Sequence, residues 1–176
     1  FPTRRSFRSN LESSPVSGSN FFFDISFVPD TKRDNVQLAA ANLDYDLTGL
    51  RVLVAEDNSM NQLLLKKVLS KWNNEPVFAC NGHEAIEKLS LEEYDVILMD
   101  IHMPELDGYE ASKAIRKMSD SAKSGIPIIA LTASVSNNLY EKIKEAGMND
   151  YIYKPFNSKE LYSKLKEIVP RSARVL

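Results

Sequence analysis

Four of five short apolar stretches in this sequence end at residues whose side chains could take part in chemistry. These residues are Glu56 and Asp57 after the first stretch, Asp100 after the third, Thr132 at the end of the fourth and Lys154 after the fifth. The second stretch ends at Cys80 and Asn81, without a charge. Because ligands of open parallel sheets bind outside the carboxyl ends of the strands, these positions predict a site at one rim of a sheet.

Three carboxylates at one rim repel each other, and burial raises the cost of keeping them charged. They persist only if a cation is present. Oxygen ligands with open coordination positions suit Mg²⁺, which keeps waters and binds phosphate. Lys154 supplies a second cation for a phosphoryl oxygen, and Thr132 supplies a hydrogen-bond donor. The set therefore predicts a magnesium-dependent phosphoryl site.

Asp100 is the best candidate for a nucleophile, because it ends the most apolar stretch, "DVILMD". A carboxylate is already ionised at neutral pH, so it can attack phosphorus and form an acyl phosphate without a general base. Charge on the equatorial oxygens is then stabilised by the metal, the ammonium and the hydroxyl group. A single aspartate at a strand end is more often a helix cap, so the prediction depends on the whole set.

The elements that must position these residues alternate between strand-like and helix-like patterns from Gly49 onward. Helix starts are predicted at the caps Asn58, Asn81 and Asp107, and Gly147 is predicted to end the fourth helix. Met60, Leu64, Val68 and Trp72 stand at helical spacing and predict the first helix. Five such units are too few for an eight-fold barrel. They predict an α/β fold with a doubly wound parallel sheet and helices on both faces.

Composition excludes several classes of function. The net charge is −2 and the pI about 5.8, so no global field attracts nucleic acid. One cysteine, Cys80, excludes an intrachain disulfide, and with only His83 and His102 a zinc site is implausible.

We expect Cys80 in the core and His83 exposed in the first turn of a helix; His102 either tunes the site or is a plain loop residue. No stretch resembles a membrane helix or a signal peptide, so we expect a cytoplasmic fragment.

These residues resemble the receiver domain of two-component signalling. The motifs that carry the resemblance are "VLVAEDN", "ILMDIHMPELDGYEA", "IIALTA" and "YIYKPF". The resemblance implies a flavodoxin-like sheet with strand order 2-1-3-4-5. It also implies that Asp100 accepts a phosphoryl group from a phosphohistidine, and that Mg²⁺ is bound by Asp57, Asp100 and the backbone carbonyl of His102.

Further roles follow from the same resemblance. Glu56 would act on the metal through a water molecule, although many relatives have aspartate at this position. Thr132 and Lys154 would hold the phosphoryl oxygens, and Tyr151 would swing inward when Thr132 moves. The Lys154–Pro155 peptide bond is expected to be cis.

The N-terminal stretch "LESSPVSGSNFFFDISFV" resembles the closing strands of the ATP-binding domain of histidine kinases, where a Ser-Gly-rich turn joins two strands. The order of segments is then that of a hybrid sensor kinase. We expect a kinase remnant at 1–28, a linker at 29–48, the receiver domain at 49–170 and a tail at 171–176. Without its original sheet, the strand near Phe21 should pack on the receiver, pair with a second copy or stay disordered. A complete sheet of its own would contradict the kinase origin.

The leading hypothesis is a relay module that exchanges a phosphoryl group with a kinase phosphohistidine or a histidine phosphotransfer protein, with homodimerisation left open. A Mg²⁺-dependent phosphatase is the first alternative, although such enzymes need a second aspartate where this chain has His102. A stand-alone response regulator is the second alternative. The chain ends soon after the last predicted helix, so we expect no DNA-binding output domain. The parent chain, as a hybrid sensor kinase, would have kinase activity and a possible membrane anchor, whereas this fragment would show only phosphorylation and dephosphorylation of Asp100.

Overall fold

The structure is a computed structural model that describes residues 7–14, 18–25, 45–133 and 138–168. The chain divides into two compact units, Phe1–Ala41 and Asn42–Leu176. The second unit contains the parallel sheet and all the predicted site residues. Among the described residues, no helix is long and apolar enough to cross a membrane.

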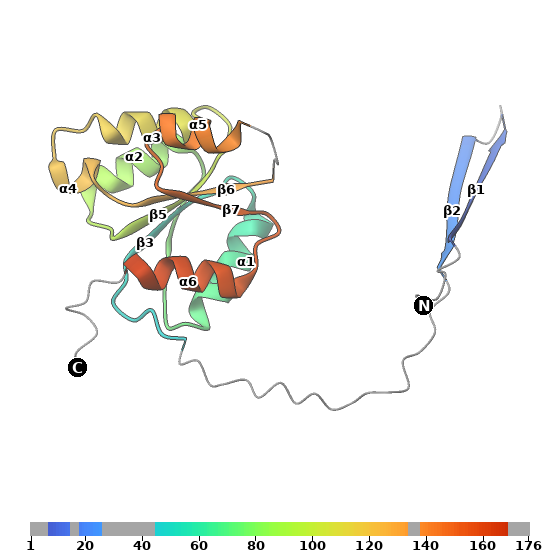
Figure 1. Ribbon diagram of the computed structural model, residues 1–176, viewed down its shortest axis with the longest axis horizontal. Coiled ribbons are helices and arrows are strands. Elements are labelled where there is room, and N and C mark those ends of the chain that lie inside the picture. Colours follow the sequence, from blue (N-terminus) through green and yellow to red (C-terminus); the bar gives the residue numbers. More distant parts are fainter. Residues whose placement is uncertain (1–6, 15–17, 26–44, 134–137, 169–176) are drawn as a thin grey trace. The chain divides into compact units, whose positions relative to one another are not determined.

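The second unit contains a five-stranded parallel sheet in the order β4-β3-β5-β6-β7 (Figure 1). Its strands are β3 (Val52–Ala55), β4 (Val77–Ala79), β5 (Val96–Asp100), β6 (Ile128–Thr132) and β7 (Asp150–Tyr153). Counted within this unit, the order is 2-1-3-4-5, so the predicted fold class is confirmed. Every residue of β3, β5 and β6 is buried, which explains why these strands are apolar up to the polar residues that end β5 and β6.

Helices cover both faces of the sheet (Figure 1). They are α1 (Ser59–Ser70), α2 (Gly82–Leu91), α3 (Gly108–Arg116), α4 (Ser121–Ser124), α5 (Leu139–Glu145) and α6 (Ser158–Ile168). One core cluster joins the sheet to α1 and α6 through residues such as Leu65 and Leu161. The other joins it to α2, α3 and α5 through residues such as Leu89, Ile115 and Ile143. The short helix α4 was not predicted from the sequence.

The predicted helix caps are present. Asn58 accepts hydrogen bonds from the backbone N–H groups of Met60 and Asn61, while Asn81 and Asp107 each accept one from the residue three positions later. Gly147, with φ of +76°, follows the C-terminal cap of α5 as predicted.

The predicted first helix is present as α1, but the apolar residues that predicted it do not all face the core. Met60 and Leu64 are 70% and 48% exposed, whereas Leu65, Leu69 and Trp72 are buried. Residues four apart advance by about 40° around a helix, so a series of three such steps leaves the face on which it started. Its two ends, Met60 and Trp72, therefore lie on different faces.

The segment before the first sheet strand is packed into the domain. Leu47 is buried and donates its backbone N–H to the carbonyl of Trp72, 2.8 Å away. The buried Asn74 side chain donates to the carbonyl oxygens of Leu47, at 3.2 Å, and Leu50, at 2.6 Å. The chain is therefore fixed to the domain some residues before β3 begins.

The first unit contains an antiparallel hairpin of β1 (Phe7–Ser14) and β2 (Gly18–Ile25). A strand at β2 was predicted, but its pairing within the chain was not among the three expected arrangements. The hairpin forms a separate two-stranded sheet, and such a ribbon alone is only marginally stable in water. The kinase origin of this segment stays a prediction.

Candidate functional site

Strand register brings the predicted site residues to one edge of the sheet. Ala55 at the end of β3 pairs with Met99, so Glu56 and Asp57 emerge beside Asp100. Carboxylate oxygens of Glu56, Asp57 and Asp100 lie within 4.8 Å of one another. The three predicted carboxylates are therefore together, with Glu56 and Asp100 buried and Asp57 exposed.

Lys154 bridges two of these carboxylates. Its Nζ lies 2.5 Å from Glu56 Oε2 and 2.6 Å from Asp100 Oδ2. Burial would lower the pKa of Lys154, but hydrogen bonds with Asp100 and Glu56 outweigh burial and raise the pKa above its ordinary value. The ammonium group is therefore held charged between the carboxylates.

Two residues that the sequence analysis missed hold Glu56, whose side chain is almost fully buried. Asn61 Nδ2 donates to Glu56 Oε1 at 2.7 Å, and Gln62 Nε2 donates to the backbone carbonyl of Glu56 at 2.6 Å. Both residues lie in the first turns of α1, directly after the cap Asn58. The sequence does contain a signal for this role, because Asn61 and Gln62 are amides three and four residues after the predicted cap Asn58.

The loop after β5 approaches Asp100 closely. A Cβ atom at Gly108 would lie 2.2 Å from the carbonyl oxygen of Asp100, so only glycine fits there. The backbone N–H of His102 donates to Asp100 Oδ1 at 3.2 Å, while the His102 side chain is exposed. The His102 backbone, rather than its imidazole, therefore borders the carboxylate.

Thr132 and Tyr151 lie on the neighbouring strands β6 and β7. Thr132 is fully buried, and its carbonyl accepts the Lys154 backbone N–H at 2.6 Å. Tyr151 is half-buried, and its ring packs edge-on against Tyr153 at 5.3 Å between centroids. The Lys154–Pro155 peptide bond is cis, as expected.

The expectation for Cys80 is wrong. Its side chain is exposed, with the thiol 3.8 Å from Gln62 Nε2. Strand β4 ends at Ala79 on the edge of the sheet, so the next side chain leaves the core. His83 is exposed in the first turn of α2, as predicted.

The donor set fits a hard divalent cation. Three carboxylates face one ammonium group, so the cluster keeps an excess of negative charge. The ligand atoms of these carboxylates are all oxygens. Mg²⁺ prefers oxygen ligands, whereas softer metals prefer nitrogen and sulfur. The exposed carboxylate of Asp57 leaves one side of the cluster open to water.

Comparison with known proteins identifies this arrangement. The family model of the response regulator receiver domain matches residues 52–166. Hybrid signal transduction histidine kinase I of Dictyostelium discoideum is 45% identical over 117 residues, covering 64% of this chain and 7% of the kinase. Sensor protein EvgS of Escherichia coli K12 is 32% identical over 162 residues, covering 90% of this chain and 13% of that protein. The chain thus spans only a small part of these relatives.

Solved structures agree. The receiver domain of the sensor histidine kinase PA1611 from Pseudomonas aeruginosa, with magnesium in its active-site cleft, is 37% identical with a TM-score of 0.62; the match covers 68% of this chain and 96% of that one. The Saccharomyces cerevisiae Ssk1 receiver domain, solved with the phosphotransfer protein Ypd1, is 35% identical with a TM-score of 0.62. This match covers 67% of this chain and 87% of that one. The chain therefore belongs to the response regulator receiver domain family and carries a receiver module of two-component phosphorelay signalling.

Proposed function

We propose that Asp100 is the residue that accepts the phosphoryl group in this receiver domain. The observation that carries the proposal is the position of its carboxylate, 2.6 Å from Lys154 Nζ and clustered with Glu56 and Asp57. Two of these carboxylates, those of Glu56 and Asp57, come from the chain just after β3. Asp100 alone ends the central strand β5, with the loop at Gly108 packed against its backbone.

The proposed step transfers a phosphoryl group from a phosphohistidine. A carboxylate oxygen of Asp100 attacks phosphorus, the P–N bond breaks, and the imidazole leaves with its electron pair and is protonated by solvent. The product is an acyl phosphate on Asp100. Lys154, already charged beside Asp100, would move onto a phosphoryl oxygen without any change in its protonation.

Asp57, Asp100 and the backbone carbonyl of His102 would bind Mg²⁺, with Glu56 contributing through water. When bound, Mg²⁺ supplies positive charge to the phosphoryl oxygens. Asn61 and Lys154 occupy the two Glu56 carboxylate oxygens, which supports an indirect role for that residue. The PA1611 receiver domain with magnesium in its cleft supports the same choice of ion.

The conformational response would begin at Thr132 and Tyr151. A phosphoryl group on Asp100 recruits the Thr132 hydroxyl, and Tyr151 fills the space left behind. Thr132 ends β6 next to β7, which carries Tyr151, so both side chains lie on neighbouring strands. Tyr151 is half-buried rather than enclosed, which is compatible with such a movement.

The proposed partners are the phosphohistidine of a kinase, in the same parent chain, and a histidine phosphotransfer protein. The first two turns of α1 expose the apolar side chains of Met60, Leu63 and Leu64 beside the site. Such a patch is suited to a protein surface that must bring a histidine to Asp100. The Ssk1 receiver domain in complex with Ypd1 supports a partner of this kind.

We also propose that the parent protein is a hybrid histidine kinase, with residues 1–28 the end of its ATP-binding domain and 29–48 a linker. The match to EvgS covers 90% of the chain, which cannot fit within residues 49–176, so it includes residues before the receiver domain. The β1–β2 hairpin matches the two closing strands expected there.

The exposed, unpaired Cys80 fits a reducing compartment, so we place the fragment in the cytoplasm.

Incubation with phosphoramidate and Mg²⁺, followed by intact-protein mass spectrometry, tests this function. Phosphoramidate has the P–N bond of the natural donor. We expect a gain of one phosphoryl group that is lost with Asp100→Asn and kept with Asp120→Asn, because Asp120 is a helix cap in another loop and asparagine also caps. An equal gain in the Asp100→Asn protein would refute the assignment. The phosphatase alternative is not favoured, since the exposed His102 stands where its acid would be.

A further inference from the structure

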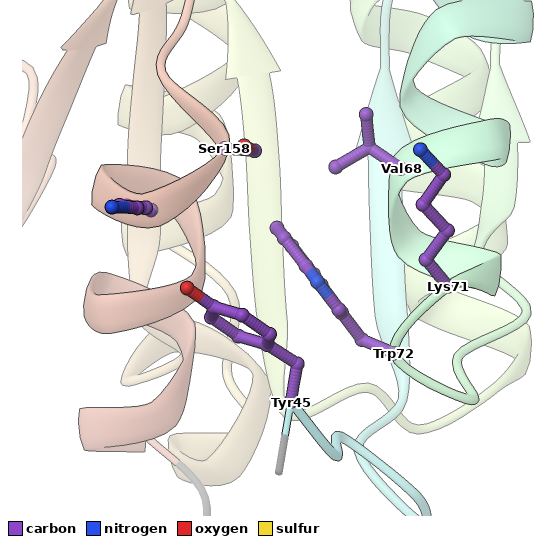
Figure 2. A pocket seen from close by; sticks show the side chains of 6 residues that line it. Tyr45, Val68, Lys71, Trp72 and Ser158 are labelled. Carbon is purple, nitrogen blue, oxygen red and sulfur yellow. The ribbon is translucent and has the colours of Figure 1, made fainter. Parts of the chain in front are cut away.

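A pocket of about 310 Å³ lies between α1 and α6, apart from the carboxylate cluster. Figure 2 shows the Trp72 indole projecting into the space between the two helices, with Tyr45 beneath it. The residues that line the pocket are Tyr45, Val68, Lys71, Trp72, Ser158 and Lys159. None of these residues belongs to the proposed phosphoryl site. The proposed function of the domain therefore does not explain the pocket.

The aromatic floor of the pocket is held in place by its own packing. The rings of Tyr45 and Trp72 are stacked at 6.1 Å between centroids with 30° between their planes. Tyr162 packs edge-on against both, at 4.6 Å from Tyr45 and 5.2 Å from Trp72. Its hydroxyl also accepts the backbone N–H of Asp46 at 3.2 Å. The pocket is therefore preformed, as small-molecule sites commonly are.

The rim of the pocket is cationic. Lys71 comes from the end of α1 and Lys159 from the start of α6, and both are exposed. Within the part of the chain that the structure describes, neither ammonium group makes an ion pair. None of the lining residues is acidic, although the whole chain has a net charge of −2. A ligand with negative charge would thus gain two partners that the protein itself leaves unused.

We propose that this α1–α6 pocket binds a small organic anion that carries a planar aromatic ring. The ring would lie against the half-buried Tyr45, with the buried Trp72 at the base of the pocket, because contact with aromatic side chains stabilises flat groups. The anionic group would pair with Lys71 or Lys159 at the rim, and the Ser158 hydroxyl offers a hydrogen bond. A volume near the lower end of ligand sites fits one ring system with its anionic group, rather than a helix of a partner protein.

Trp72 is the only tryptophan of the chain, so its fluorescence reports directly on this pocket. We choose adenosine 5′-monophosphate as the probe, because it joins a planar base to a phosphate. In Mg²⁺-free buffer we expect saturable quenching of Trp72 emission. Adenosine, which lacks the charge, and inorganic phosphate, which lacks the ring, should each bind at least about tenfold more weakly, since each keeps only one of the two interactions.

Matched variants locate the binding. The double variant Lys71→Met/Lys159→Met keeps the alkyl stems and should weaken binding by about tenfold, because both candidate partners of the anionic group are removed. Lys117→Met, at an exposed lysine after α3, and Asp100→Asn should both bind like the unmodified chain. Amide chemical shifts of Val68, Lys71, Ser158 and Lys159 should move on titration. These shifts provide a second readout that does not depend on fluorescence.

Three outcomes would overturn the proposal. The first is the absence of saturable quenching and of amide shifts at millimolar probe. The second is unchanged affinity in the double lysine variant. The third is loss of binding in Asp100→Asn, which would place the phosphate group in the carboxylate cluster instead. Each result leaves the phosphorylation test of Asp100 unaffected, so the two proposals fail or stand separately.

Discussion

Lys154 Nζ lies 2.6 Å from Asp100 Oδ2, although the two residues are 54 positions apart in the chain. The ammonium group therefore lies beside the carboxylate that we propose as the phosphoryl acceptor. Because Lys154 also binds Glu56 Oε2 at 2.5 Å, it neutralises part of a buried acidic cluster before any cation or phosphoryl group arrives. This pairing gives Lys154 a role in stability beside its proposed role in phosphoryl transfer.

Lys154→Met should therefore destabilise the domain, because it leaves the buried Glu56 and Asp100 carboxylates without their cation. We expect a loss of about 1–3 kcal/mol in the free energy of unfolding without Mg²⁺. Urea denaturation measures this loss. Added Mg²⁺ should stabilise the variant more than the unmodified protein, since the ion replaces the missing charge. Equal stability of the two proteins without Mg²⁺ would contradict the pairing described here.

Asp57→Asn should weaken Mg²⁺ binding at least about tenfold, because Asp57 is a proposed direct ligand on the open side of the cluster. Isothermal titration calorimetry with MgCl₂ measures the affinity. Glu105→Gln, at another exposed carboxylate outside the cluster, is the control and should bind Mg²⁺ normally. Similar affinities for both variants would remove Asp57 from the ligand set.

Gly108→Ala should be strongly destabilising, because the new Cβ would lie 2.2 Å from the backbone oxygen of Asp100. Backbone must then move, and we expect a loss above about 2 kcal/mol together with slower phosphorylation. Gly49→Ala is the matched control. Its φ of +82° carries a strain of about 1 kcal/mol, but its Cβ meets no atom within 4 Å. Thermal unfolding of both variants should show the larger shift for Gly108→Ala, and the reverse order would disprove the close approach.

Glu84 links protonation to stability at the start of α2. Its carboxylate accepts the Cys80 backbone N–H at 2.6 Å, and this hydrogen bond, with a smaller contribution from Lys88, holds the pKa of Glu84 below its ordinary value of 4.5. A lowered folded pKa means that the contribution is complete above the unfolded pKa and is lost as pH falls through the folded pKa. The effect should thus disappear in the acid range below about pH 4.5.

Glu84→Ala should accordingly cost about 1 kcal/mol at pH 7 and less as the pH falls toward 3. Glu84→Gln keeps an acceptor for Cys80 N–H without titrating, so it should be milder at pH 7 and less dependent on pH. Urea denaturation across this pH range gives the comparison. A cost for Glu84→Ala that is constant with pH would show that the carboxylate charge contributes nothing.

Much of the site was predictable because parallel strands expose their carboxyl ends at one edge. That rule alone identifies Glu56, Asp57, Asp100 and Lys154, and the structure brings them together. The supporting amides were not identified. Asn61 and Gln62 look like ordinary polar residues of a helix, and their bonds to Glu56 depend on the angle at which α1 leaves β3.

The sequence by itself determined the alternation of the five sheet strands with their main helices, three helix caps and the residues at the strand ends, because these depend on local propensity and on periodic burial. Only the tertiary structure decided which face of α1 is buried, that Cys80 is exposed, and that Tyr45, Trp72 and Tyr162 meet to form the floor of a pocket. Those features depend on how helices lie against the sheet and against each other. A contact between residues more than a hundred positions apart, such as Tyr45 and Tyr162, leaves no periodic pattern in the sequence from which it could be predicted.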